Sequence, residues 1–333
     1  MSLRRNFLKL IDKSQSILII QPDRPDGDSL SSALALEEIL SDYGKKVTLY
    51  CGVNIPEYIR FIDGWDRVNN TIDKTPDLTI LVDDASKILL DKFENTPLFS
   101  SVISKPFVII DHHQNVSTDI QYCTLNLTEP NYSSAGELIY DIFNELNITV
   151  SLTAKKLILQ SILSDTMGLT NDLANANTYR LVADIIDDGV SRTELEEARK
   201  AYSKMDENVF RYKAALIKRV EFYENNQIGL CVIPESEAYD IGTLYNPGPL
   251  ILGELLMVKD LKVALAIKTY KNHATVAIRC TYGNPVAHKL AELFGGGGHD
   301  YSAGFRIQPY NGNLNNLKEI IVNELKELLN NNE

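Results

Sequence analysis

The chain has 333 residues, of which 44% are hydrophobic and 23% are charged, and its formal net charge is -12. Because a single core stops growing well below this length, two domains are expected. A surface this acidic excludes general binding to duplex nucleic acid, since that affinity comes from Lys and Arg side chains that neutralise phosphates. Any nucleic-acid substrate should therefore be short, or be held by a local device such as a metal ion.

The four cysteines form no CxxC pair, and their spacing indicates neither a disulfide framework nor a zinc site. The N-terminal residues 1–16 are too polar for a signal peptide. No apolar run approaches the roughly 20 residues that span a bilayer. We therefore expect a cytoplasmic protein that does not interact with membranes.

Short apolar runs alternate with amphipathic stretches in the first half of the chain. The apolar runs predict strands at 16–20, 47–50, 78–82 and 107–110. The amphipathic stretches predict helices at 29–43, 134–146 and 153–164. Continuous apolar strands separated by helices indicate an α/β fold with a Rossmann-like parallel sheet that helices cover on both faces.

The second half of the chain has a different pattern. A charged helical stretch at 181–220 suits a connector between domains. Strands are predicted at 228–233, 263–269 and 274–279, with the last two paired, and helices at 248–258 and from Asn284-Pro285 to Phe294. We predict a catalytic domain at 1–190, a helical linker at 191–220 and a smaller α/β domain at 221–333.

Carboxylates and imidazoles follow the predicted elements of the first domain at the points where these elements end. In an open parallel sheet the carboxyl ends of the strands form the ligand crevice, so these groups should meet at one edge. The residues concerned are Asp26 and Asp28, Asp83, the series Asp111-His112-His113, and Asp165.

Converging carboxylates repel one another, and a divalent cation removes that cost. Carboxylates with one or two imidazoles favour Mn²⁺ or Mg²⁺, with Fe and Zn as alternatives. Two ions about 3.5–4 Å apart would form the usual clamp for displacement at phosphorus. Asp26, Asp28 or Asp83 alone would be better explained as a turn or helix-cap residue, but the four segments together favour a metal site.

A run of four glycines, Gly295–Gly298, precedes His299 near the end of the second domain. Glycine-rich backbone can approach an anion closely, and His299 could donate a hydrogen bond to a phosphate. Arg279 is a candidate phosphate ligand on the strand before it. The alternatives are a helix C-cap, for which one glycine suffices, and an ordinary surface arginine.

This order of motifs resembles the DHH phosphoesterase superfamily with its DHH-associated C-terminal domain. The resemblance extends over about residues 17–307, and chain length and motif order look most like the branch that degrades short oligoribonucleotides and dephosphorylates 3′-phosphoadenosine 5′-phosphate. The motifs that carry it are Pro25-Asp26-Gly27-Asp28, Asp83, Asp111-His112-His113, Ser164-Asp165-Thr166 and Gly295–His299.

The resemblance implies a role for each of these residues. Asp26 would hold one metal ion, and Asp83 would bridge both ions. His113 would contact the scissile phosphate, and Asp111 would orient the histidine pair. The other ion would be held by Asp28, His112 and Asp165. The substrate would be bound by Arg279, Gly296, Gly297, Gly298 and His299.

The chain departs from the family pattern at Pro22. The family has a histidine ligand of the first ion at this position, and proline cannot coordinate through its side chain. Gln21 and Asp23 flank it, and Asp23 is the better surrogate. A carboxylate in place of an imidazole would favour hard ions such as Mg²⁺ or Mn²⁺.

We expect Mn²⁺-dependent hydrolysis of short RNA to mononucleotides, or of the 3′-phosphate of adenosine 3′,5′-bisphosphate, in a cleft between the domains. Two Mn²⁺ ions are expected, with Mg²⁺ as the alternative. Rival functions are a cyclic or linear dinucleotide phosphodiesterase, a manganese pyrophosphatase, which the glycine run disfavours, and a non-catalytic nucleotide-binding protein with a degraded first metal site. No stable protein partner is implied, and a homodimer stays open.

Overall fold

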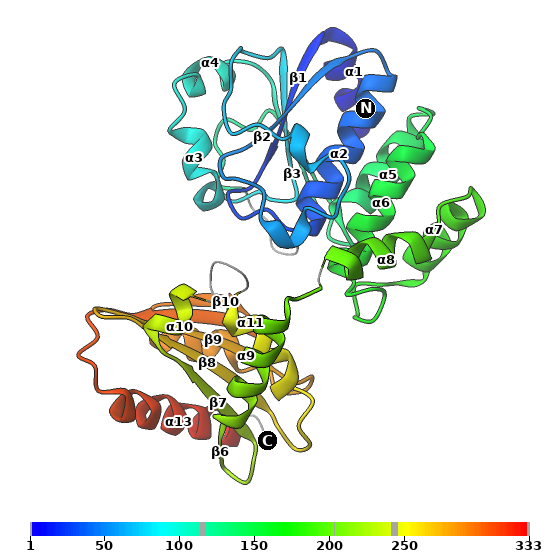
Figure 1. The fold of residues 1–333 in the computed structure, drawn as a ribbon. Coiled ribbons are helices and arrows are strands. Elements are labelled where there is room, and N and C mark those ends of the chain that lie inside the picture. The colour runs from blue at the N-terminus through cyan, green and yellow to red at the C-terminus, as the bar shows by residue number, and fades with distance from the viewer. Residues whose placement is uncertain (1, 114–117, 203, 241–245, 332–333) are drawn as a thin grey trace. The chain divides into compact units, whose positions relative to one another are not determined.

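The computed structural model describes residues 2–113, 118–202, 204–240 and 246–331 and divides into two compact units, Met1–Lys204 and Met205–Glu333 (Figure 1). The predicted linker at 191–220 is shared between them. Helix α8 (Arg192–Tyr202) belongs to the first unit and α9 (Glu207–Lys218) to the second. Among the described residues, no helix is both long and apolar enough to cross a membrane.

The first unit is built on a five-stranded, fully parallel sheet in the order β2-β1-β3-β4-β5. The four predicted strands are confirmed, with ends that shift by one residue at most, and the fifth was not predicted. The strands are β1 (Ser16–Gln21), β2 (Lys46–Cys51), β3 (Leu78–Val82), β4 (Phe107–Asp111) and β5 (Leu125–Thr128).

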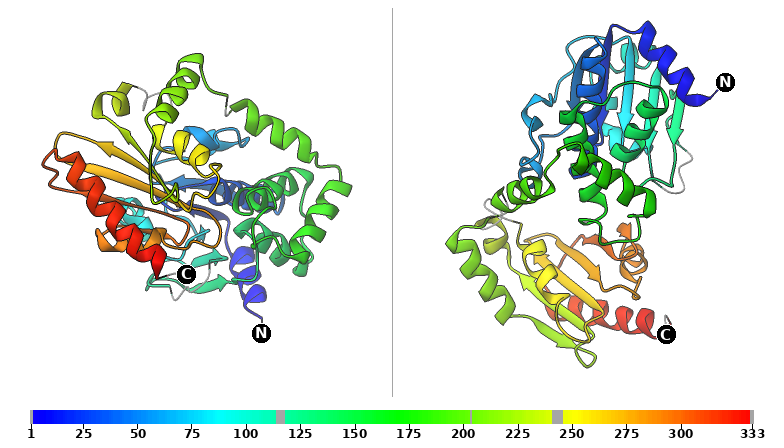
Figure 2. Two further views of the ribbon diagram at one scale, coloured as in Figure 1. Left: turned by 90° about the horizontal axis from the view of Figure 1, so that it is seen from below. Right: turned by 90° about the vertical axis from the view of Figure 1, so that its right-hand side faces the viewer.

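Helices cover both faces of this sheet, as the apolar strands require (Figures 1 and 2). The larger core lies under α1 (Leu3–Lys13), α2 (Gly27–Asp42), α5 (Ala135–Glu145), α6 (Leu152–Asp165) and α7 (Ala176–Asp187). The opposite face packs against shorter elements, which are η3 (Lys87–Leu90), α3 (Asp91–Glu94) and α4 (Phe99–Val102). Two further 3₁₀ turns, η1 (Glu57–Ile59) and η2 (Trp65–Arg67), follow β2.

The strand order places a topological switch point next to β1. After β1 the chain crosses to β2 on one side, whereas β3 pairs with β1 on the other side. At such a point the connections leave in opposite directions and open a crevice at the carboxyl ends of the strands. The segments that carry Asp28 and Asp83 follow β1 and β3, so they flank this crevice.

Helix α1 is attached to the sheet edge through Arg4, whose side chain is only 12% exposed. Its guanidinium binds Glu129, just beyond β5, at 3.1 Å and Asp141 of α5 at 2.7 Å. It also donates to the hydroxyl of Tyr132 at 2.9 Å. These contacts raise the pKa of Arg4 against the opposing effect of burial, so its charge is permanent. Arg4 thus connects three segments that are distant in sequence.

Replacing Arg4 by Met should lower the unfolding free energy of the first unit by about 2 kcal/mol, between the values for exposed and buried ion pairs. The only tryptophan, Trp65, lies in this unit, so its fluorescence during urea unfolding measures the change. Lys156→Met is the control, because it breaks an exposed pair with Asp63 and should cost under about 0.5 kcal/mol. Equal effects of the two substitutions would contradict the role of Arg4.

The second unit has a mixed six-stranded sheet in the order β10-β11-β9-β8-β7-β6, in which only β7 and β8 pair in parallel. Helices α9 and α11 (Pro247–Leu255) pack on one face, and α12 (Ala287–Leu293) and α13 (Leu314–Asn330) on the other (Figure 2). The strands are β6 (Glu221–Tyr223), β7 (Ile228–Ile233), β8 (Val263–Thr269), β9 (Ala274–Cys280), β10 (Gly297–His299) and β11 (Ser302–Ile307), and α10 spans Glu235–Asp240. The expected fold class, a parallel α/β sheet with a second, smaller α/β unit, is confirmed.

One predicted helix start in this unit is wrong. Helix α12 begins at Ala287 after Val286, not at Asn284-Pro285. The backbone N–H of Asn284 donates to the carbonyl of Thr281 across a turn in which Gly283 has a φ of 86°. Asn284 therefore closes a turn and is not free to cap a helix.

Candidate metal centre

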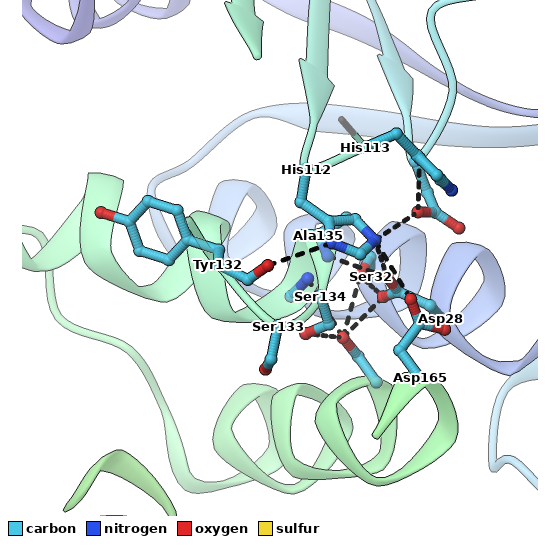
Figure 3. A network of polar contacts seen from close by, with 12 residues as sticks. Asp28, Ser32, His112, His113, Tyr132, Ser133, Ser134, Ala135 and Asp165 are labelled. Atoms are coloured by element: carbon cyan, nitrogen blue, oxygen red, sulfur yellow. Dashed lines mark hydrogen bonds and ion pairs between the residues drawn. The ribbon is translucent and has the colours of Figure 1, made fainter. Parts of the chain in front are cut away.

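Three carboxylates converge on a single imidazole nitrogen at the switch point (Figure 3). Nε2 of His112 lies 3.1 Å from Asp165, 3.3 Å from Asp28 and 3.4 Å from Asp83. The four residues come from α2, the end of β3, the end of β4 and the last turn of α6. All are buried except Asp165, whose side chain is 18% exposed. The structure thus gathers groups that are up to 137 residues apart in sequence.

The pKa values of the residues in this cluster are strongly shifted. Burial and the charge of Asp28 raise the pKa of Asp83 well above its ordinary value, and the same causes raise the pKa of Asp165 to about 6. Burial would lower the pKa of His112, but the carboxylates of Asp165, Asp28 and Asp83 around its Nε2 raise it. Without a cation, the cluster is therefore poised to hold protons, as expected when buried carboxylates crowd together.

Asp28 is enclosed by hydrogen-bond donors. Its Oδ1 accepts from the hydroxyls of Ser32 at 2.7 Å and Ser161 at 2.6 Å, and its Oδ2 accepts from the backbone N–H of Ala135 at 2.8 Å. Burial alone would raise the pKa of Asp28, but the contact with His112 and these donors lower it. Asp28 is thereby held ionised, in one orientation, at the centre of the cluster.

The close packing of α5 on α6 that makes this enclosure possible depends on Gly136. A β-carbon at this position would lie 2.2 Å from the hydroxyl oxygen of Ser161 and 2.7 Å from its β-carbon. The N–H of Gly136 also donates to that hydroxyl at 3.0 Å. Any side chain here would push Ser161 away from Asp28.

We expect Gly136→Ala to lower the unfolding free energy of the first unit by about 2 kcal/mol, the usual cost of overpacking, despite the better helix propensity of Ala. Trp65 fluorescence during urea unfolding measures this change in free energy, and the affinity for Mn²⁺ should fall in parallel. Gly253→Ala in α11 adds the same methyl group where no atom lies within 4 Å, so it should stabilise by up to about 1 kcal/mol, as followed by circular dichroism. If Gly136→Ala left the unfolding free energy unchanged, Ser161 would be able to move without cost.

Contacts at Nδ1 fix the ring orientation of both His112 and His113. Nδ1 of His112 lies 3.2 Å from the carbonyl oxygen of Tyr132, so Nδ1 donates and Nε2 faces the carboxylates. The fully buried carboxylate of Asp111 lies 2.7 Å from Nδ1 of His113. It also accepts hydrogen bonds from the backbone N–H groups of His112 and His113. His113 is half exposed, which leaves its outer nitrogen accessible from the crevice.

These residues fit a divalent cation. Oδ1 of Asp83 and Nε2 of His112 are buried but have no hydrogen-bond partner of acceptable geometry among the described residues. Nε2 carries at most one proton, so it cannot satisfy three carboxylates at once. The ligand atoms of Asp28, His112 and Asp165 lie within 4.8 Å of one another, and so do those of Asp83, His112 and His113. Such a mainly oxygen donor set suits Mn²⁺ or Mg²⁺.

Three other candidates near β1 lie differently. Asp26 caps α2, where its side chain accepts from the N–H of Ser29, and it belongs to neither group of clustered ligand atoms. Asp23 accepts from the backbone N–H of Lys92 at 2.8 Å, so its carboxylate faces α3. Gln21 is buried, and neither polar atom of its carboxamide has a partner among the described residues. The role of a surrogate at Pro22 stays a prediction for Asp23.

The second unit aligns three of its residues in one row across neighbouring strands. Arg279 of β9 pairs with Ser302 of β11, and Ser302 pairs with His299 of β10. Arg279 is partly buried, donates to the carbonyl of Ile278 and has no carboxylate partner among the described residues. Burial lowers its pKa. The backbone positions of Arg279 and His299, predicted as phosphate-binding residues, thus lie on either side of Ser302.

The glycines before His299 have structural reasons for being glycine. Gly295 ends α12 with a φ of 72°. A β-carbon at Gly296 would lie 2.3 Å from the carbonyl oxygen of Gly304, and one at Gly298 would lie 2.5 Å from the α-carbon of Ala303. Gly297 alone in this run has neither a close contact to such a β-carbon nor a positive φ. The alternative reading of this run as backbone packing therefore accounts for three of its four glycines.

Sequence reasoning missed the residues that support the cluster. Ser32 and Ser161 lie inside helices, where serine is usually unremarkable, and Tyr132 acts through its backbone carbonyl. The stretch 132–138 also resembles the same superfamily branch, which is the one sequence signal at Tyr132, and that resemblance assigns no role to any atom.

Comparison with known proteins identifies the family. Residues 16–167 match the model of the "DHH family, N-terminal domain". This stretch of the first unit is a DHH-family N-terminal domain. The chain is 23% identical to the bifunctional oligoribonuclease and PAP phosphatase NrnA of Bacillus subtilis over 92% of this chain and 93% of that one. It is also 24% identical to the probable bifunctional oligoribonuclease and PAP phosphatase NrnA of Streptococcus mutans over 98% of each chain.

Solved structures agree on the fold. An exopolyphosphatase-related protein from Bacteroides fragilis superposes with a TM-score of 0.85 at 17% identity, over 99% of this chain and 97% of that one. The predicted resemblance to the DHH superfamily and its NrnA-like branch is confirmed, and the relatives of this branch are named for the hydrolysis of phosphate esters.

Proposed function

We propose that this DHH protein hydrolyses short oligoribonucleotides to mononucleotides and removes the 3′-phosphate of adenosine 3′,5′-bisphosphate, in both cases with a divalent cation. The observation that carries the proposal is the convergence of Asp28, Asp83 and Asp165 on Nε2 of His112. Both activities appear in the name of the Bacillus subtilis relative, which aligns with this chain over nearly its whole length.

Asp28, Asp83, His112 and Asp165 would hold Mn²⁺, with Mg²⁺ as the alternative ion, and Asp26 would contribute to a second site. When bound, the cation would supply charge neutralisation and Lewis acidity at a phosphate oxygen. The donor set supports this choice of ion, since carboxylates outnumber imidazoles.

The chain's own side chains would bind and orient the substrate. Asp111 holds Nδ1 of His113, which supports a contact between the opposite ring nitrogen and the scissile phosphate. In the second unit, Arg279 has a positive charge that no carboxylate among the described residues neutralises, which supports its binding of a substrate phosphate together with His299. The small substrate agrees with a net charge of -12.

The test is an assay with Mn²⁺ over a substrate panel of two- to five-residue RNAs, adenosine 3′,5′-bisphosphate, cyclic dinucleotides and pyrophosphate. We expect mononucleotides from the short RNAs and adenosine monophosphate from the bisphosphate. Turnover of cyclic dinucleotides or pyrophosphate alone would replace this proposal with another activity of the superfamily.

A second candidate is a nucleotide-binding protein without catalysis. Pro22 favours it, because the side chain at this position cannot act as the ligand that the family pattern provides. Binding of a short RNA without any product, at Mn²⁺ concentrations that saturate the protein, would establish this candidate and exclude the first.

A further inference from the structure

A cavity of about 780 Å³ lies in the first unit next to the carboxylate cluster. Asp26 and Gly27 line it, and the next residue, Asp28, belongs to the cluster. Ser164 also lines it, and the next residue, Asp165, belongs to the cluster as well. The cavity is therefore one residue away from the cluster along both α2 and α6. A group inside it could be part of a molecule whose phosphate reaches the carboxylates.

The walls of the cavity suit a flat, uncharged ring. They are formed largely by apolar and aromatic side chains, among them Tyr58, Phe61, Leu163 and Met167. The charged residues that line it, Asp26, Arg192, Glu196 and Arg199, carry equal numbers of positive and negative charges, so they favour neither an anion nor a cation. The volume lies within the range of small-molecule sites, roughly 300–1,000 Å³.

One buried polar group in this cavity lacks a partner. Gln160 of α6 lines the cavity and is only 7% exposed, and its carboxamide oxygen accepts no hydrogen bond within the part of the chain that the structure describes. Leaving such an acceptor unsatisfied is costly, so a ligand that donates a hydrogen bond to it, once the terminal amide turns its oxygen toward the cavity, would gain affinity. The exocyclic amine of adenine, guanine or cytosine is such a donor.

The loop after α6 presents Met167 at this cavity in an unusual backbone conformation. Met167, Gly168 and Leu169 have consecutive positive φ values of 51°, 76° and 72°. Hydrogen bonds to the side chain of Thr166 and from the hydroxyl of Tyr179 hold the loop in this form. Met167 is nevertheless 73% exposed, so packing in the core does not explain the strain. Strained residues with exposed apolar side chains are frequent at binding sites.

We propose that this cavity is a nucleobase pocket that takes the amine-bearing base of the nucleotide whose phosphate is at the metal centre. Tyr58, Phe61 and Met167 contact the ring, and Gln160 accepts from its exocyclic amine. This pocket rests on the proposed function, because it assigns the substrate's base to a site next to the reacting phosphate. It makes Met167 and Gln160 binding residues for the base.

The test is calorimetric titration of the full chain with adenosine 5′-monophosphate in the presence of Mn²⁺. Adenosine monophosphate is a product of both proposed reactions, so hydrolysis does not contribute. Met167→Ala should weaken binding about tenfold, in the range found for single base contacts. Gln160→Leu should weaken it about fivefold, through one lost hydrogen bond. Met257→Ala, which removes an 84% exposed methionine of the second unit, is the matched control and should bind as the wild type does. Ribose 5-phosphate should bind the wild type about tenfold more weakly and be insensitive to Met167→Ala.

Unchanged affinity of Met167→Ala for adenosine monophosphate would overturn the pocket, since this exposed side chain can be removed without unfolding the chain. So would an equal loss for ribose 5-phosphate. The failure of the proposed function has a different signature: no substrate of the panel is turned over, while adenosine monophosphate still binds in a way that depends on Met167 and Gln160.

Discussion

Replacing Asp83 by Asn is expected to lower kcat/KM about a thousandfold while the fold persists. Oδ1 of Asp83 lies 3.4 Å from Nε2 of His112 and 3.9 Å from Nδ1 of His113, so this carboxylate is close to both histidines. Asn retains the shape of Asp and, like Asp, tolerates the positive φ of 61° at this position. The substitution therefore removes the charge with little disturbance of the backbone.

The stability of this variant should change in the opposite direction. Because burial raises the pKa of Asp83, its ionised form is disfavoured in the folded protein, and Asn removes that cost. In EDTA, Asp83→Asn should unfold at a higher temperature than the wild type and bind less Mn²⁺. Asp63→Asn is the control, since the side chain of Asp63 is 80% exposed and pairs with Lys156. This variant should change neither the unfolding temperature nor the Mn²⁺ binding. Near-normal rates in Asp83→Asn would remove Asp83 from the metal centre.

Without divalent ions, the contribution of Asp165 to stability should decrease as the pH rises from about 4 to about 7. In the unfolded chain this carboxyl loses its proton near its ordinary pKa of 3.8, but in the folded protein only near a pKa of about 6. Between these values the folded state binds more protons, so a higher pH favours unfolding. The total effect is about 3 kcal/mol.

The measurement is urea unfolding in EDTA at several pH values, followed by Trp65, for the wild type and Asp165→Asn. The difference between the unfolding free energies of the two proteins isolates the contribution of Asp165. Asp165→Asn should become more stable than the wild type as the pH rises, and Mn²⁺ should cancel that advantage by stabilising the ionised wild type. A difference that is constant with pH would contradict the raised pKa.

The position of the metal centre could be predicted because its signals are local. Four apolar runs end in a carboxylate or an imidazole, and a parallel sheet brings the ends of its strands together. The arrangement around Asp28 could not be predicted in this way. Ser161 contacts it only because α6 packs against α2 and α5, and nothing in the helix 152–165 distinguishes Ser161 from a surface serine.

Competing local signals explain the elements that were missed. Strand β5 has only four residues, two of them polar, and only Leu127 is fully buried, so it lacks the continuous apolar run of its neighbours. Helix α13 buries Leu317, Ile321, Leu325 and Leu329 at helical spacing, but its many asparagines indicated a low-complexity tail. Helix α1 was considered only as a leader segment. Its attachment through Arg4 depends on acidic residues more than 120 positions away.

The packing of the glycine run determines how future variants of it can be interpreted. A methyl group at Gly296 or Gly298 would collide with β11, so a loss of nucleotide affinity in either variant would report a distorted hairpin and not a lost ligand contact. Gly297 is the informative position, because a larger residue there meets open space. A mutational screen that treated all four glycines alike would attribute to phosphate recognition a loss of affinity that a steric clash causes.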